Sequence, residues 1–149
     1  MDVERFLDAV QRERYYAGQI VHVHHIPARE AAYAELARPL PEVLTRVLAE
    51  EGITRLYTHQ VDAIEAVRRG ENVVVVTSTA SGKTVCYNVP VLEMLLDNPE
   101  GRALYLFPTK ALAQDQLKTL KRYRELEPTL PLEAGTYDGD TPPDERRRL

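Results

Sequence analysis

Apolar residues recur at intervals of three or four along several stretches of the chain, which places them on one face of a helix. Stretches of this kind lie at Val3–Val10, Pro41–Leu48, Thr58–Val67, Val85–Leu96 and Lys110–Arg124. Proline is tolerated at the first position of a helix, and glycine often ends one. We therefore expect the second helix to begin at Pro41 and to end before Gly52. The third should have Thr58 as its N-cap and end before Gly70.

Strands are predicted between the later helices. Val73–Val76 is a continuous β-branched run, which is typical of a strand covered on both faces. Ala103–Phe107 and Leu132–Tyr137 are the next two expected strands, and Ile20–His24 is a short one near the N-terminus. Alternation of strands and helices predicts parallel β-α-β units, hence an α/β fold with a parallel sheet flanked by helices. We assign residues 1–52 to an N-terminal helical and strand appendage and residues 53–149 to the α/β domain.

Composition and charge narrow the possible functions. The chain has 149 residues, of which 44% are hydrophobic and 28% charged, so it can build a core. Its net charge of -4 means that any nucleic-acid binding must be local. Cys86 is the only cysteine, which excludes an internal disulfide and a cysteine-cluster metal site and suits a reducing, cytoplasmic location. The apolar runs are too short to cross a bilayer, so we expect no membrane partner.

The segment Thr77–Thr84 carries the most informative chemistry. It reads Thr-Ser-Thr-Ala-Ser-Gly-Lys-Thr and lies between a predicted strand and a predicted helix. Gly82 lets the backbone approach phosphate oxygens, and Lys83 supplies a charge for the β- and γ-phosphates. Thr84 offers a hydroxyl to Mg²⁺, while the helix N-terminus adds a partial positive charge. The segment therefore predicts a phosphate-binding loop formed by Thr79, Ala80, Ser81, Gly82, Lys83 and Thr84, with Lys83 and Thr84 as the catalytic pair.

This loop departs from the usual pattern in one position. The usual loop has a glycine five positions before the Gly-Lys pair, and Thr77 stands there. The alternative interpretation is an ordinary strand-to-helix turn that happens to contain Gly-Lys-Thr. The strand, loop and helix context favours the nucleotide-binding interpretation.

Further motifs occur in a fixed order around the loop: Tyr57-Thr58-His59-Gln60, then Thr79–Thr84, then Phe107–Gln116, and finally Tyr137–Pro142. With these motifs the chain resembles the superfamily 2 DEAD/DEAH-type helicases, as the N-terminal part of the first RecA-like domain. The amino-acid sequences of Cys86–Pro90 and Tyr137–Pro142 resemble those of one branch of these helicases that acts on DNA. That branch comprises the RecQ4-like helicases of fungi and the bacterial mitomycin-repair helicases, which implies a role in DNA repair.

The resemblance implies roles for individual residues. Gln60 matches the glutamine that recognises adenine, which would make ATP, with Mg²⁺, the bound nucleotide. Tyr57 is the nearby aromatic that could stack on the base. Pro108–Ala111, with Thr109 and Lys110, matches a motif that holds the nucleic-acid backbone, and Gly139 and Asp140 belong to a further strand-gripping motif. An Asp-Gly pair is also a turn signal in its own right.

The basic residues of the chain concentrate where the resemblance places nucleic acid. The stretch 108–124 contains five basic residues, Lys110, Lys118, Lys121, Arg122 and Arg124, against one acidic residue, Asp115. It is expected to bind a phosphate backbone on one face and to pack on the core with the other. Only the sequence resemblance to the DNA-directed branch favours DNA over RNA as the nucleic acid that is bound.

The acidic pair that would hold Mg²⁺ and position water is not apparent. Glu50-Glu51 lies on a helix end, and Asp138 and Asp140 flank a glycine. Asp144-Glu145 follows two prolines, so none of the three pairs ends a buried strand. The resemblance therefore implies a chain truncated before its Walker B strand, with the remainder of the helicase as its missing partner and no turnover by itself.

Two other classes of function stay open. A truncated lobe could bind nucleic acid or a protein partner without catalysis. A small P-loop kinase would need neither Gln60 nor Pro108–Ala111, and the presence of both disfavours it. The leading prediction is the ATP-binding front part of an ATP-dependent DNA helicase.

Overall fold

The structure is a computed structural model that describes residues 2–28 and 30–147. The chain divides into two compact units, Met1–Glu30 and Ala31–Leu149. The division into appendage and domain at residue 53 stays a prediction, although the unit that carries the loop begins at Ala31. No described helix is long and apolar enough to cross a membrane.

The first unit contains one helix. Helix α1, Val3–Gln11, confirms the amphipathic pattern, and its N-cap Asp2 accepts a hydrogen bond from the backbone N–H of Arg5 at 3.1 Å. The expected strand at Ile20–His24 is wrong, because these described residues are assigned to no strand. A strand is stable only beside a hydrogen-bonded neighbour, and this alternating segment has none among the described residues.

The second unit holds the remaining helices: α2 (Glu42–Glu50), α3 (Thr58–Arg68), α4 (Lys83–Asp97), α5 (Lys110–Leu126) and the short α6 (Pro143–Arg146). The four long ones confirm the predicted pattern. Gly52 and Gly70 follow α2 and α3 with positive φ angles of 77° and 79°, as glycines beyond a helix end do. The predicted caps shift by one residue, since Pro41 is the N-cap of α2 and Tyr57, not Thr58, is that of α3.

The predicted parallel sheet is not formed by the described residues. Their sheet has two short antiparallel strands, β1 (Tyr33–Ala34) and β2 (Leu56–Tyr57), with Tyr33 opposite Tyr57. The segments 73–76, 103–107 and 132–137 are in no strand. Val74 and Val76 are 89% exposed, and Leu104 and Leu106 are 83% exposed. The composition of these segments favours strands that are covered on both faces. A strand also needs a neighbouring strand to which it can hydrogen-bond, and these segments have none among the described residues.

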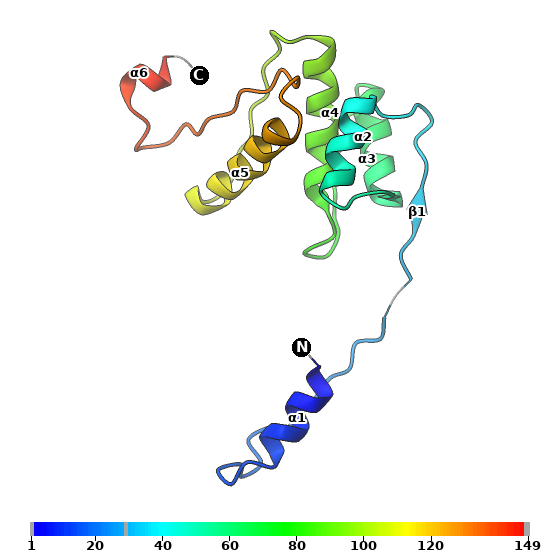
Figure 1. Cartoon of the computed structure of the whole chain (residues 1–149), viewed down its shortest axis with the longest axis vertical. Coiled ribbons are helices and arrows are strands. Elements are labelled where there is room, and N and C mark those ends of the chain that lie inside the picture. The colour runs from blue at the N-terminus through cyan, green and yellow to red at the C-terminus, as the bar shows by residue number, and fades with distance from the viewer. Residues whose placement is uncertain (1, 29, 148–149) are drawn as a thin grey trace. The chain divides into compact units, whose positions relative to one another are not determined.

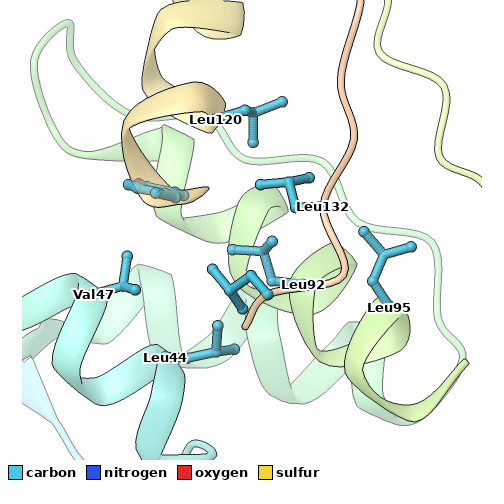
Figure 2. Packing of buried hydrophobic residues seen from close by; sticks show 8 residues of the cluster. Leu44, Val47, Leu92, Leu95, Leu120 and Leu132 are labelled. Atoms are coloured by element: carbon cyan, nitrogen blue, oxygen red, sulfur yellow. The ribbon is translucent and has the colours of Figure 1, made fainter. Parts of the chain in front are cut away.

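Two apolar clusters hold the helices together. In the first, Leu44 and Val47 of α2 meet Leu92 and Leu95 of α4, as Figure 2 shows. Leu120 and Tyr123 of α5 and the segment after it, with Leu130 and Leu132, complete this cluster. The C-terminal half of α5 is thereby fixed to the body formed by α2 and α4.

The second cluster brings α3 against α4 (Figure 1). It contains Val61 and Ile64 of α3 and Val85 and Val89 of α4. A shielded ion pair adds to it, because Arg68 donates to Glu93 through Nε at 3.0 Å and Nη2 at 2.6 Å. Their side chains are only 11% and 8% exposed. This packing places the start of α3 beside the loop that leads into α4.

Candidate nucleotide-binding and nucleic-acid-binding sites

The loop enters α4 through a glycine that has little freedom to change. Gly82 is the N-cap of α4 with a φ of 74°, in the left-handed region that favours glycine. A Cβ atom added to it would lie 2.5 Å from Nε2 of Gln60. Ala80, two residues earlier, also has a positive φ, of 57°. Gly82 therefore makes room for the Gln60 side chain as well as allowing the turn.

The ammonium group of Lys83 lies within the curve of the loop. Its Nζ donates to the carbonyl oxygens of Ser78 at 2.6 Å and Thr77 at 3.1 Å. It also lies 3.4 Å from Oγ of Ser81, which in turn is 2.6 Å from Oγ1 of Thr77. The loop thus gathers a cation at the N-terminus of a helix, where backbone N–H groups also attract anions. Thr79 and Ala80 are exposed to solvent.

Two side chains from the start of α3 fix this loop. Gln60, which is 2% exposed, accepts from the backbone N–H of Tyr57 at 2.9 Å and donates to the carbonyl oxygen of Gly82 at 2.9 Å. His59 Nε2 lies 3.0 Å from the carbonyl oxygen of Ser81. The structure therefore joins Gln60 to the predicted phosphate-binding loop, across 22 residues of sequence. Sequence reasoning paired Gln60 with the loop by motif and missed the His59 contact.

An aromatic column stands beside these contacts. The Tyr57 ring stacks on that of Tyr33, with centroids 5.1 Å apart, and on that of His59, with centroids 5.7 Å apart. The guanidinium of Arg55 lies 4.0 Å from the centroid of the Tyr33 ring, which is cation–π distance. Sequence reasoning named Tyr57 alone. The pairing of β1 with β2 brings Tyr33 to it, and no local spacing indicates that pairing.

Thr84, the predicted Mg²⁺ ligand, follows Lys83 in the first turn of α4. Its Oγ1 lies 3.4 Å from the hydroxyl of Tyr87, which donates to Oε1 of Gln116 on α5 at 2.9 Å. A hydroxyl oxygen is a ligand type that Mg²⁺ accepts. The site fits a Mg²⁺–polyphosphate group, since a hard oxygen donor, an ammonium and a helix N-terminus lie in one turn.

The predicted nucleic-acid residues gather around the start of α5. Thr109 is the N-cap of α5, and its Oγ1 accepts from the backbone N–H of Leu112 at 3.3 Å. Pro108, Lys110 and Ala111 are exposed on the surface. The structure brings the separate Tyr137–Pro142 motif to this point through an ion pair.

That ion pair joins Lys110 to Asp140, with Asp138 3.9 Å away from the same ammonium. Both partners are exposed, Lys110 at 56% and Asp140 at 84%, and Gly139 between the two aspartates is exposed too. The pKa of the Asp140 carboxyl lies below its ordinary value, because its carboxylate accepts a hydrogen bond from Lys110. The same bond raises the pKa of Lys110. The two predicted nucleic-acid motifs thus contact each other directly.

One of the other acidic groups that the sequence offered has a separate partner. Glu51 forms an ion pair with Arg122. Among the side chains that the structure describes, which exclude that of Glu145, no three histidine, cysteine or acidic groups gather as metal ligands. The roles of the predicted catalytic, cofactor and nucleic-acid residues stay predictions.

Comparison with known proteins places the chain in a family. The DEAD/DEAH box helicase family matches residues 57–149. The uncharacterized ATP-dependent helicase YprA of Bacillus subtilis is 45% identical over 130 residues, covering 87% of this chain and 17% of YprA. The ATP-dependent helicase hrq1 of Schizosaccharomyces pombe is 42% identical over 151 residues, covering 99% of this chain and 14% of hrq1.

A solved structure is similar as well. The DUF1998 helicase MrfA, crystallised with DNA and AMPPNP, is 46% identical, with a TM-score of 0.77 over 84% of this chain and 17% of MrfA. The chain thus spans about one-sixth of the length of the relatives it matches. These relatives confirm the predicted branch, that of the RecQ4-like and mitomycin-repair helicases. The chain belongs to the DEAD/DEAH box helicase family.

Proposed function

We propose that this chain is the ATP-binding front part of an ATP-dependent DNA helicase. It binds ATP with Mg²⁺ through Thr79–Thr84 and a DNA strand through Pro108–Ala111, together with Gly139 and Asp140. The observation that carries the proposal is the Lys83 ammonium, gathered within a loop whose backbone is fixed by Gln60 and His59.

The selection of adenine rests on the hydrogen-bonding capacity of Gln60. A glutamine amide has two N–H donors and two acceptor lone pairs. One of each is used, by Gly82 and Tyr57, so one donor and one acceptor remain. These match N7 and the N6 amino group of adenine. Guanine presents an oxygen where adenine has its amino group, so it would leave the glutamine oxygen unpaired.

The Mg²⁺ ion would be held by the Thr84 hydroxyl together with the phosphate oxygens. Bound there, Mg²⁺ supplies neutralisation of phosphate charge. Lys83 would orient the β- and γ-phosphates, and the first N–H groups of α4 would bind their oxygens. Hydrolysis needs, in addition, an acidic group that positions water. We propose that none of the described residues provides one and that this chain lacks turnover by itself.

DNA binding is supported by the polar start of α5. Thr109 and the first amides of α5 can contact a phosphate, and Lys110 adds charge. A relative, MrfA, has been crystallised with DNA. A non-catalytic binding module is the second candidate function, and it would also use Gln60 and Pro108–Ala111, which a kinase would not need.

Nucleotide competition and turnover test the proposal. A fluorescent ATP analogue with Mg²⁺ should be displaced by ATP more readily than by GTP, by about fivefold to tenfold, which corresponds to one hydrogen bond. Lys83→Ala should abolish binding of the analogue, whereas Lys118→Ala, a lysine on α5, should not change it. ATP hydrolysis with DNA should stay at the level of the Lys83→Ala variant. Displacement by GTP and ATP alike would contradict the role of Gln60, and measurable turnover would contradict the lack of catalysis.

A further inference from the structure

Tyr87 lies in the Cys86–Pro90 stretch that is similar to one helicase branch, but neither the resemblance nor the proposed function gives its side chain a role. It lies one helical turn after Thr84 on α4, and its hydroxyl stands between the two candidate sites. On one side this hydroxyl is 3.4 Å from Oγ1 of Thr84, and on the other it donates to Oε1 of Gln116 on α5 at 2.9 Å. Its ring meets that of Tyr105 edge-on, with centroids 5.6 Å apart and planes at 74°. One side chain thus joins the predicted Mg²⁺ ligand to the helix that begins with the DNA motif.

The direction of these two bonds follows from the number of hydrogens. A tyrosine hydroxyl has one hydrogen, so it can donate to one acceptor only. The shorter contact, to the Gln116 oxygen, takes it. The Thr84 oxygen, at the longer distance, is the competing acceptor for the same hydrogen. When Thr84 gives a lone pair to a cation, its oxygen becomes a poorer acceptor, which leaves the tyrosine hydrogen to Gln116.

The two halves of helix α5 are held differently, and the contact between Tyr87 and Gln116 lies in the less anchored half. Its C-terminal half is anchored in the apolar cluster by Leu120 and Tyr123. Its first turns, from Lys110 to Asp115, bury no side chain fully. The polar contacts that hold them include Lys110 to Asp140 and Gln114 to the Thr136 hydroxyl at 3.3 Å. The bond from Tyr87 to Gln116 ties this half of α5 to the nucleotide-binding helix.

We propose that Tyr87 is a positioning residue that couples nucleotide binding at Thr84 to the orientation of the first turns of α5, and hence to DNA affinity. The inference rests on the proposed function, because it needs a nucleotide at the loop and DNA at the start of α5. Nucleotide with Mg²⁺ at Thr84 removes the competing acceptor, so the Tyr87 hydroxyl donates to Gln116 alone. This bond holds Thr109 and Lys110 where they meet a DNA phosphate.

The test compares DNA affinity with and without nucleotide. Fluorescence anisotropy of a labelled single-stranded DNA gives its Kd in the presence and absence of AMPPNP with Mg²⁺. We expect the nucleotide to tighten DNA binding by about fivefold or more, the lower end of usual coupling between sites. Tyr87→Phe keeps the ring against Tyr105 and removes the hydroxyl. It should bring the two Kd values together while AMPPNP affinity stays within about twofold. Gln116→Leu should do the same, and the double variant should add nothing further.

A control separates coupling from stability. Tyr105→Phe removes a hydrogen bond of 3.0 Å to the buried Asn88, the neighbour of Tyr87 on α4. It leaves the contacts of Tyr87 with Thr84 and Gln116 intact. It should lower the unfolding midpoint and keep the DNA coupling. Retained coupling in Tyr87→Phe, or equal loss of coupling in Tyr105→Phe, would overturn the inference.

Measurements on the wild-type chain distinguish failure of the proposed coupling from failure of the proposed function. If it binds both ligands but with the same DNA Kd in both conditions, the coupling is wrong and the proposed function stands. If AMPPNP does not bind, or binds equally to the Lys83→Ala variant, both are wrong.

Discussion

The two candidate sites of this chain are held in place by different physical means. The nucleotide loop is fixed from within, since Gln60 is buried and bonds to the backbone of the loop, and α3 and α4 pack behind it. The start of α5 is held at the surface, mainly by the exposed ion pair of Lys110 and Asp140. Buried bonds to backbone are costly to break, whereas exposed pairs are weak and screened by salt. The loop should therefore be rigid and insensitive to salt, and the start of α5 should be adjustable.

The largest effect is expected from the buried ion pair between the later parts of α3 and α4. Arg68→Ala leaves Glu93 buried without its partner, which should cost about 3 kcal/mol of unfolding free energy. The neighbouring Arg69 pairs with Glu71 at the surface and serves as a matched control. Arg69→Ala should leave the urea midpoint unchanged. Equal losses in the two variants, measured by urea unfolding, would remove the distinction between buried and exposed anchoring.

The next effect is expected at Gly82. Gly82→Ala forces a Cβ into the left-handed region, at a cost of roughly 1–2 kcal/mol, and pushes it against Gln60. Nucleotide affinity should fall along with stability. Combining it with Gln60→Ala removes the clash but keeps the strained φ, so the stability loss of the double variant should be smaller than the sum. Additive losses in a double-mutant cycle would show that Gly82 and Gln60 do not contact each other.

Removal of the Gln60 amide should have an intermediate effect. Gln60→Ala leaves the Tyr57 N–H and the Gly82 carbonyl without their partner, which should cost about 1–2 kcal/mol. Because the lost bonds are buried, the loss should be the same at low and high salt. Gln114→Ala, whose amide contacts the Thr136 hydroxyl at the exposed surface, is the matched control. A salt-dependent loss in Gln60→Ala would place this glutamine at the surface instead.

The smallest effects are expected at the surface pair. Lys110→Ala should weaken DNA binding and lower the slope of log Kd against log salt by about 1, the share of one phosphate contact. Asp140→Asn alters a residue of the proposed DNA site and removes the ionic partner of Lys110, so it should weaken DNA binding, with no effect on nucleotide affinity. The lowered pKa of Asp140 means that its pairing persists above its ordinary pKa and is lost as pH falls through the lowered value. Stronger DNA binding by Asp140→Asn would instead show that Asp140 only withholds Lys110 from DNA.

Local patterns predicted the helices of this chain well and its strands poorly. The apolar faces of α2, α3, α4 and α5 pack against one another. The spacing of apolar residues within each segment is therefore enough to predict that the segment is a helix. A strand depends on a neighbour that may lie anywhere in the sequence, and Val73–Val76 shows that β-branched composition alone does not supply one.

The same limit applies to the site. The loop and Gln60 were found from motifs, because glycine, lysine and glutamine stand at fixed spacings. Tyr33 and Arg55 were missed, because they reach Tyr57 only through the β1–β2 pairing. Tyr87 was missed too, since the link from Thr84 to Gln116 depends on how α4 and α5 pack.

The central claim is that Thr77–Thr84 binds a nucleotide through Lys83. Its most direct test is equilibrium titration of a fluorescent ATP analogue with Mg²⁺ into the wild-type chain and the Lys83→Ala and Lys118→Ala variants, at low and high salt. The account predicts saturable binding to the wild type and Lys118→Ala at both salt concentrations and none to Lys83→Ala. Equal binding by all three proteins, or none to the wild type, would contradict it.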